Sequence, residues 1–203
     1  DPFTNLALDK SISNIKSRNI FKSVNYKISE GTAKNLKKIE LIVEEKPTGE
    51  VSAGAGIGTN GGTFGFSVKE NNYLGEGKNV AFNIEVDQES LRGTLNYQDP
   101  NYDFLGNAVN YYVTSSSNDK PDQGYENTIM GAGISTSFEQ YNDVYATIGV
   151  SATHDDLQTL DTASASLKKQ SGTFNEISAN YGFALDKRNR SFMPTDGSII
   201  SFN

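Results

Sequence analysis

Residues 80–98 read VAFNIEVDQESLRGTLNYQ, and this stretch decides the fold. On either side of the polar residues 88–90, apolar side chains alternate with polar or small ones. Alternation with a period of two predicts two strands, each with one apolar and one polar face, joined by a tight connection. The sequence therefore predicts an antiparallel sheet here rather than helices.

The same alternation recurs over most of residues 49–203. It predicts about eight strands and the start of another near Ser198, each close to the ~9–11 residues that a tilted strand needs to cross a bilayer. Short connections mix with longer polar ones, the longest at 115–125 and 154–172. Short turns on one rim and long loops on the other are typical of an outer-membrane β-barrel. In that fold the apolar side chains face lipid and the small polar ones face the lumen. The other strand segments lie at 51–58, 64–68, 109–113, 130–138, 144–152 and 177–185.

Composition excludes several classes of protein. The formal net charge of −7 argues against a nucleic-acid partner, because phosphate binding needs a basic face. The chain has no Cys and one His, which excludes disulfide scaffolds and sites built from Cys or several His ligands. No apolar run approaches the ~18 residues of a membrane-spanning helix. The mean hydropathy of −0.52 still suits a barrel, in which only alternate residues meet lipid.

Charge divides the chain into two unequal parts. Residues 1–48 carry nine basic and six acidic side chains, whereas residues 49–203 carry nine and nineteen. Pro47 and Gly49 lie at this boundary and interrupt regular structure. The first part predicts a helix capped by Thr4 or Asn5 and ended near Asn19, followed by two strands. So short a segment forms a very small core and is interpreted as the end of a larger α+β module.

A soluble β-sandwich is the main alternative for residues 49–203, because its strands also alternate. Sandwich strands average about 5–6 residues, and the segments here are nearly twice as long. Strand length therefore favours the barrel, although periodicity alone leaves both folds open.

Three motifs could suggest chemistry, and each has a simpler interpretation. The segment from Gly56 to Gly61 matches G-x-G-x-x-G, but a strand pattern follows it where dinucleotide binding needs a helix, so we predict a hairpin. His154 and the two carboxylates after it are predicted to lie in a solvated loop. The basic residues of 186–190 are interpreted as a solvated turn, or as a contact with anionic lipid headgroups. No catalytic residue, cofactor site or metal site is predicted.

The first strand of the ladder is rich in Gly and Ala. Glycine inside a strand weakens pairing and lets another backbone approach closely, so this strand could form a seam that opens and accepts a new strand. Alternatively, glycine here relieves crowding inside a tight wall. The residues alone leave both explanations open. The candidate pairing edge consists of Val51, Ser52, Ala53, Gly54, Ala55, Gly56, Ile57 and Gly58.

Several ordered segments together resemble the BamA family of outer-membrane protein assembly factors. Residues 9–46 resemble the end of the last POTRA domain of that family, and residues 45–49 resemble its junction with the barrel. The segment from Asn72 to Gly77 is similar to an N-x-L-G-x-G turn, and 99–102 to a D-P-x-Y-like turn. Residues 186–197 are similar to a D-x-R…P-T-x-G element. The resemblance covers nearly the whole chain.

The resemblance implies a fold, a location and a function. The fold would be a partial transmembrane antiparallel β-barrel of about eight to nine strands, 49–203, preceded by a partial periplasmic POTRA domain, 1–48. The function would be a non-enzymatic insertase in the Gram-negative outer membrane that templates client strands. Its implied partners are nascent outer-membrane proteins, accessory lipoproteins and outer-membrane lipid. A polypeptide-secreting pore of the two-partner type and a small anchoring barrel are the alternatives.

Overall fold

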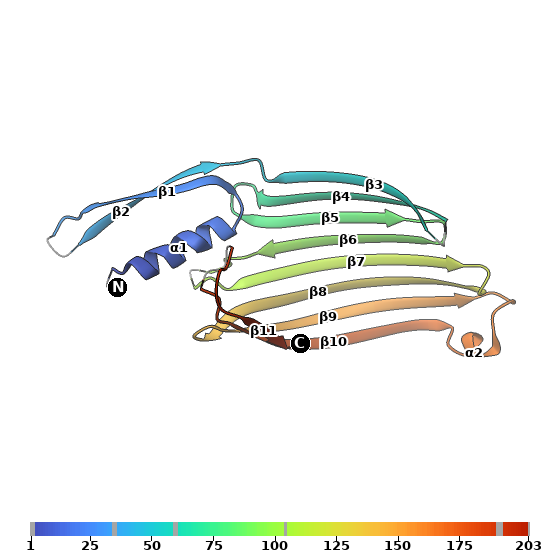
Figure 1. Cartoon of the computed structure of the whole chain (residues 1–203). Coiled ribbons are helices and arrows are strands. Elements are labelled where there is room, and N and C mark those ends of the chain that lie inside the picture. Colours follow the sequence, from blue (N-terminus) through green and yellow to red (C-terminus); the bar gives the residue numbers. More distant parts are fainter. Residues whose placement is uncertain (1–2, 34–35, 59–60, 104, 190–192, 203) are drawn as a thin grey trace. The chain divides into compact units, whose positions relative to one another are not determined.

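The computed structural model describes residues 3–33, 36–58, 61–103, 105–189 and 193–202 (Figure 1). The chain divides into two compact units. One comprises Asp1–Thr48 with Leu185–Ile200, and the other comprises Gly49–Ala184 with Ser201–Asn203.

The first unit contains a helix followed by two strands, as the sequence predicts. Helix α1 spans Asn5–Ser17, and the Thr4 hydroxyl caps it by accepting the N–H of Ala7 at 3.1 Å. The chain leaves the helix through Asn19, whose φ of 56° is a conformation that Asn tolerates better than most residues. Strands β1 (Phe21–Glu30) and β2 (Lys37–Glu45) then form an antiparallel pair.

The core of this unit is small. Leu8 and Ile12 of α1 pack with Val24 of β1, and Ile15 and Phe21 lie partly buried against them. Every residue of β2 is exposed. The packed core therefore joins the helix to the first residues of β1.

The second unit is built on one antiparallel meander. In the described residues, nine strands form a sheet in the order β11-β10-β9-β8-β7-β6-β5-β4-β3, and a short helix, α2 (Ala165–Lys168), precedes β10. The predicted eight strands and the start of a ninth are confirmed. The sheet is not closed, because β3 and β11 are its edge strands. The strands are β3 (Gly49–Gly58), β4 (Gly61–Tyr73), β5 (Lys78–Val86), β6 (Ser90–Asp99), β7 (Ala108–Lys120), β8 (Tyr125–Tyr141), β9 (Val144–Thr159), β10 (Gly172–Asp186) and β11 (Ile199–Phe202).

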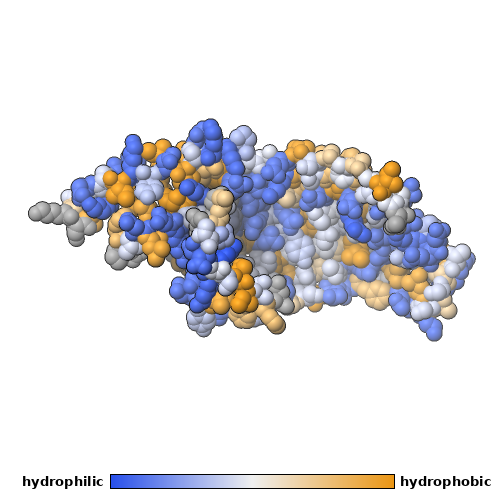
Figure 2. Space-filling view, viewed as in Figure 1, coloured by the Kyte–Doolittle hydropathy of each residue, from blue (hydrophilic) through white to orange (hydrophobic). Residues whose placement is uncertain are grey.

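The two faces of the sheet differ in chemistry, as the alternation predicts. On one face Phe82, Leu95 and Val113 are cross-strand neighbours, and these side chains are 40%, 47% and 55% exposed. The opposite face carries Gly, Ser, Thr and Asn, with Asn83 donating to the Thr94 hydroxyl at 3.2 Å. In Figure 2 the middle of the sheet is pale to blue, the colours of residues of intermediate to hydrophilic character.

The exposed apolar face decides between the two folds considered from sequence. A sandwich covers the apolar face of each sheet with the other sheet, which leaves a dry interior. Among the described strand residues from β3 to β11, Val109 and Ala146 are the buried apolar side chains other than glycine. The sheet is therefore a single layer with an uncovered apolar face, and the sandwich interpretation is wrong.

Two predicted long loops are wrong in extent. Strand β7 continues to Lys120 and β8 starts at Tyr125, so most of 115–125 is strand. Likewise β9 continues to Thr159. Polar residues there pair through their backbones and also bond across strands, as Asn118 does with Asn127 at 2.9 Å. These strands thus run past the apolar band, which a search for hydrophobic alternation does not detect.

The connections do not sort by length as predicted. We call the end of the sheet with connections 74–77, 100–107, 142–143 and 187–198 the linker rim, since β3 also begins there after the 46–48 linker. The other end, with connections 87–89, 121–124 and 160–171, we call the far rim. Both rims mix short and longer connections (Figure 1). In the described residues, neither helix has the length and apolar content needed to cross a membrane.

Candidate functional site: the open edge of the first sheet strand

Strand β3 is the edge of the sheet, and it carries all eight residues of the predicted pairing edge. In the described residues it pairs with β4 alone, in a continuous register from Gly49 opposite Glu70 to Gly58 opposite Gly61. Every residue of β3 is exposed, and the side chain of Ile57 is 95% exposed. Its second side is thus an unpaired row of backbone donors and acceptors.

The direction of each backbone group follows from one bond and the strand registers. In an antiparallel ladder, successive residues point their N–H and C=O groups to opposite sides. The N–H of Asp87 donates to the carbonyl of Ser90 at 2.9 Å, so the backbone N–H and C=O groups of Asp87 point toward β6. The backbone groups of its neighbour Val86 therefore point toward β4, where Val86 is paired with Phe64. Phe64 must in turn point toward β5.

The alternation then reaches the edge strand. Gly65, next to Phe64, points toward β3 and stands opposite Gly54. Gly54 and the even-numbered residues of β3 therefore use their backbone groups to hold β4. The odd-numbered residues present theirs to the open edge, and their side chains lie on the apolar face of the sheet. These residues are Val51, Ala53, Ala55 and Ile57.

The glycines of β3 are not required by crowding among the described residues. A Cβ placed on Gly54, Gly56 or Gly58 would meet no heavy atom within 4 Å. Glycines deeper in the sheet differ, because a Cβ on Gly133 would lie 2.5 Å from the ring of Tyr112. A Cβ on Gly149 would lie 2.4 Å from the amide of Asn180. Relief of crowding thus explains Gly133 and Gly149, and it finds no support at the edge glycines or at the inner Gly65 and Gly93.

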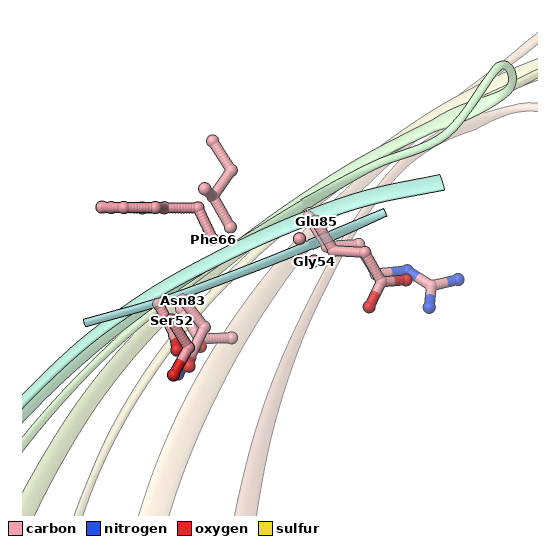
Figure 3. A pocket seen from close by; sticks show the side chains of 10 residues that line it. Ser52, Gly54, Phe66, Asn83 and Glu85 are labelled. Atoms are coloured by element: carbon pink, nitrogen blue, oxygen red, sulfur yellow. The ribbon is translucent and has the colours of Figure 1, made fainter. Parts of the chain in front are cut away.

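The polar face beside this edge is a shallow hollow of ≈470 Å³. Ser52, Asn83 and Glu85 project on that side, and Phe66 projects on the other (Figure 3). Gly54 and Gly65 form its floor, since neither has a side chain. From Ser52 to Gly58 the edge strand therefore has little side-chain bulk on the polar face, and on the other face Ala53 and Ala55 lie between Val51 and Ile57.

Comparisons with known proteins give this sheet a family. A family model described as the Omp85 superfamily domain matches residues 72–203. The chain belongs to the Omp85 superfamily.

Similar proteins narrow the likeness. The Omp85 chain is 25% identical over 167 residues to "Outer membrane protein assembly factor BamA" of Neorickettsia risticii (strain Illinois), covering 81% of this chain and 23% of that protein. It also resembles the structure of BamA from Haemophilus ducreyi lacking POTRA domains 1–3, with a TM-score of 0.66 and 18% identity over 96% of this chain and 41% of the other. A second similar structure is that of CdiB from Acinetobacter baumannii, with a TM-score of 0.52 and 12% identity over 92% of this chain and 40% of the other. The resemblance to the BamA family is confirmed.

The matched region begins with a turn whose motif has a physical explanation. The side-chain oxygen of Asn72 accepts the N–H of Gly77 at 2.8 Å, and the Asn72 carbonyl accepts the N–H of Gly75 at 2.9 Å. Gly75 and Gly77 have φ values of 76° and 68°, which glycine adopts without steric cost. The N-x-L-G-x-G pattern of the Omp85 chain therefore encodes one rigid turn.

The remaining candidate motifs have mixed outcomes. Strand β4 follows the G-x-G-x-x-G segment, which confirms the hairpin, although residues 59–60 of its turn lie outside the described residues. The loop predicted around His154 is wrong, because His154 lies inside β9 with Nδ1 2.8 Å from Oδ1 of Asn175. Arg188 forms a 2.6 Å ion pair with Asp186, and Arg190 lies outside the described residues.

Sequence reasoning located the edge strand but missed its division into two sets of residues. Part of the information needed to find the two sets lies in the sequence, because the connection between β5 and β6 is short and each strand alternates regularly. Tracing the alternation from that turn requires the strand order and registers, which the sequence did not supply. The structure supplies both.

Proposed function

We propose that this Omp85 chain is part of an insertase of the Gram-negative outer membrane, in which β3 templates strands of nascent outer-membrane proteins. The likeness to BamA supports an assembly role, and the chain spans 23% of that curated relative. On this proposal, residues 49–203 form the first half of a barrel in the membrane. Residues 1–48 are the end of a periplasmic POTRA domain, and accessory lipoproteins bind to the complete protein.

The observation that carries the proposal is the set of open backbone groups on Val51, Ala53, Ala55 and Ile57. An unpaired N–H or C=O in hydrocarbon costs several kcal/mol, so a barrel strand cannot enter lipid alone. Pairing with β3 satisfies one edge of the entering strand. The new strand then extends the sheet, so its alternate side chains continue the apolar face.

This chemistry requires no catalytic residue, cofactor, nucleotide or nucleic acid. The driving force is burial of the client's apolar side chains in lipid together with completion of its backbone hydrogen bonds. A template strand needs an unpaired edge, small side chains that let another strand approach, and a length that spans the client strand. Strand β3 meets these conditions through its Gly and Ala residues and its continuous register with β4.

A polypeptide-secreting pore of the two-partner type is the alternative function. The fold matches structures of both BamA and CdiB, so the fold alone does not choose between the functions. The curated sequence match to BamA favours the assembly function.

Reconstitution separates the two functions. The full-length protein that carries this chain would be placed in lipid vesicles with either an unfolded eight-stranded client barrel or an unfolded secreted polypeptide. We expect the client to gain protease resistance and a folded gel mobility, and the secreted polypeptide to stay outside. Entry of the secreted polypeptide into vesicles, without folding of the client, would favour the pore and contradict the insertase.

A further inference from the structure

The connections of the linker rim expose large apolar side chains at their tips. Leu74, Tyr102, Leu105 and Tyr141 are 78%, 66%, 72% and 69% exposed. Leu74, Tyr102 and Leu105 lie in the connections β4–β5 and β6–β7, and Tyr141 ends β8, so all four lie along one end of the sheet. Scattered single apolar residues are normal on a surface, whereas a contiguous set marks an interaction site.

The turns that carry these side chains are held rigidly. The N–H groups of Leu105 and Asn107 donate to Oδ1 of Asp103 at 3.0 and 3.1 Å, and the Asn107 amide donates to Oδ2 at 2.6 Å. The Asn107 N–H in particular holds the pKa of Asp103 below its ordinary value, so this carboxylate stays charged at neutral pH. In the next connection, the N–H of Asp143 donates to Glu139 at 3.0 Å.

The backbone of Leu74 has an unfavourable conformation. Its φ of 56° is a left-handed conformation that disfavours residues with a Cβ other than Asn and Asp, by roughly 1 kcal/mol. The same side chain is exposed to solvent and gains no packing in return. Strained backbone of this kind clusters at sites that serve binding or switching.

Acidic side chains surround the apolar row. Glu76, Asp103, Glu139 and Asp143 lie in or beside these connections, and Lys78 is the cation among residues 70–78, 98–108 and 138–145. Lys78 is occupied by a 2.5 Å ion pair with Glu76. The linker rim therefore presents apolar tips in a field of negative charge.

The far rim lacks this combination in the described residues. Leu160 is the large apolar side chain exposed in its described connections, and Ile57 and Phe174 are exposed in the strand ends beside them. Its turns instead pack on one another: the Leu160 N–H donates to the Gly124 carbonyl at 2.8 Å, and Lys120 pairs with Glu89. Exposed apolar tips are therefore not a general property of the connections in this sheet.

We propose that the linker rim binds a separate folded protein that presents basic side chains around apolar ones. A hollow of ≈600 Å³, lined by Leu105, Phe138 and Tyr141 among others, lies between two of the connections and can receive an apolar side chain. The carboxylates then meet the partner's cations, which speeds encounter and rejects acidic proteins. The proposal does not depend on strand templating at β3.

Charge favours a basic protein over the membrane surface as the occupant. Tyr and Leu also occur at lipid headgroups, where amphipathic side chains collect. Anionic headgroups attract cations, however, and residues 70–78, 98–108 and 138–145 carry six carboxylates and one lysine, Lys78, which is paired with Glu76. In the described part of the connection 187–198, Arg188 is paired with Asp186, and Lys187 is the other cation. A basic protein satisfies both the apolar tips and their charged surroundings.

The test measures peptide binding to the full-length protein in nanodiscs of zwitterionic lipid. The probe is a labelled peptide of alternating lysine and leucine, and a glutamate–leucine peptide of equal length is its control. We expect the combined variant Leu74→Asn, Leu105→Ser, Tyr141→Ser to raise the Kd of the lysine peptide about tenfold. Glu139→Gln with Asp143→Asn should raise it several-fold and reduce its dependence on salt. The matched far-rim variant Leu160→Ser should leave Kd unchanged.

Three results would overturn the proposal. One is equal affinity of the wild-type protein and the combined variant for the lysine peptide. Another is equally tight binding of the glutamate peptide. The third is strong quenching of a fluorophore at Tyr102→Cys by quenchers attached to lipid chains, which would place the rim in the bilayer. Client assembly at a normal rate in the combined variant would leave the templating function standing in each case.

Discussion

Replacing Ala55 with proline is expected to stop client assembly while leaving the sheet folded. The N–H of Ala55 points to the open edge, so proline removes a donor that the β3–β4 ladder does not use, and its ring blocks the approach of another strand. Proline is tolerated in strands at this type of edge position. Each unsatisfied backbone group in lipid costs several kcal/mol, so we expect the rate of client folding in vesicles to fall at least about tenfold.

Two controls make the Ala55→Pro result specific. Ala55→Val keeps the N–H and should support assembly near the wild-type rate. Gly54→Pro removes an N–H that points toward β4, and it should lower the denaturant midpoint of the protein itself. Wild-type client folding by a folded Ala55→Pro protein would show that the edge groups of β3 do not template clients.

Replacing Leu95 with arginine is expected to impair membrane insertion of the protein itself. Leu95 lies between Phe82 and Val113 on the apolar face, 47% exposed with no protein layer over it. An arginine on the lipid face of a barrel costs about 2–4 kcal/mol near the bilayer midplane. The fraction folded in vesicles at a fixed urea concentration should therefore drop steeply.

Asn96→Arg is the matched control for this prediction. Asn96 is the next residue on the same strand and lies on the polar face, where an arginine can remain in water. We expect its urea midpoint to differ little from that of the wild-type protein. Equal stability of the Leu95→Arg and Asn96→Arg proteins would contradict the assignment of the apolar face to lipid.

The parts of the fold that sequence predicts are those with a strong local cause. Thr4 and Asn19 bound the first helix because both act locally, Thr4 through its side-chain hydroxyl and Asn19 through its left-handed backbone, and the sequence shows both residues directly. The strands with large alternating apolar residues, such as β5 and β6, were predicted for the same reason. The extensions of β7 and β9 were missed because their pairing comes from neighbouring strands and not from local hydrophobic contrast.

The candidate site shows the same limit. Its Gly and Ala content marked residues 51–58 as unusual, yet two explanations remained open from sequence. Only the spatial neighbours distinguish Gly54, with open space above it, from Gly133, which the ring of Tyr112 covers. Which residues face the open edge likewise depends on strand order, a property of the whole sheet.

Crosslinking from the edge strand tests the central claim most directly. A cysteine at Ala53 or Ala55 of the full-length protein would be paired with cysteines scanned along the terminal strand of a client during active assembly. Templating predicts disulfides with alternate client residues, since alternate side chains share a face. Disulfides that form only with the protein's own last strand, at any stage of assembly, would contradict it.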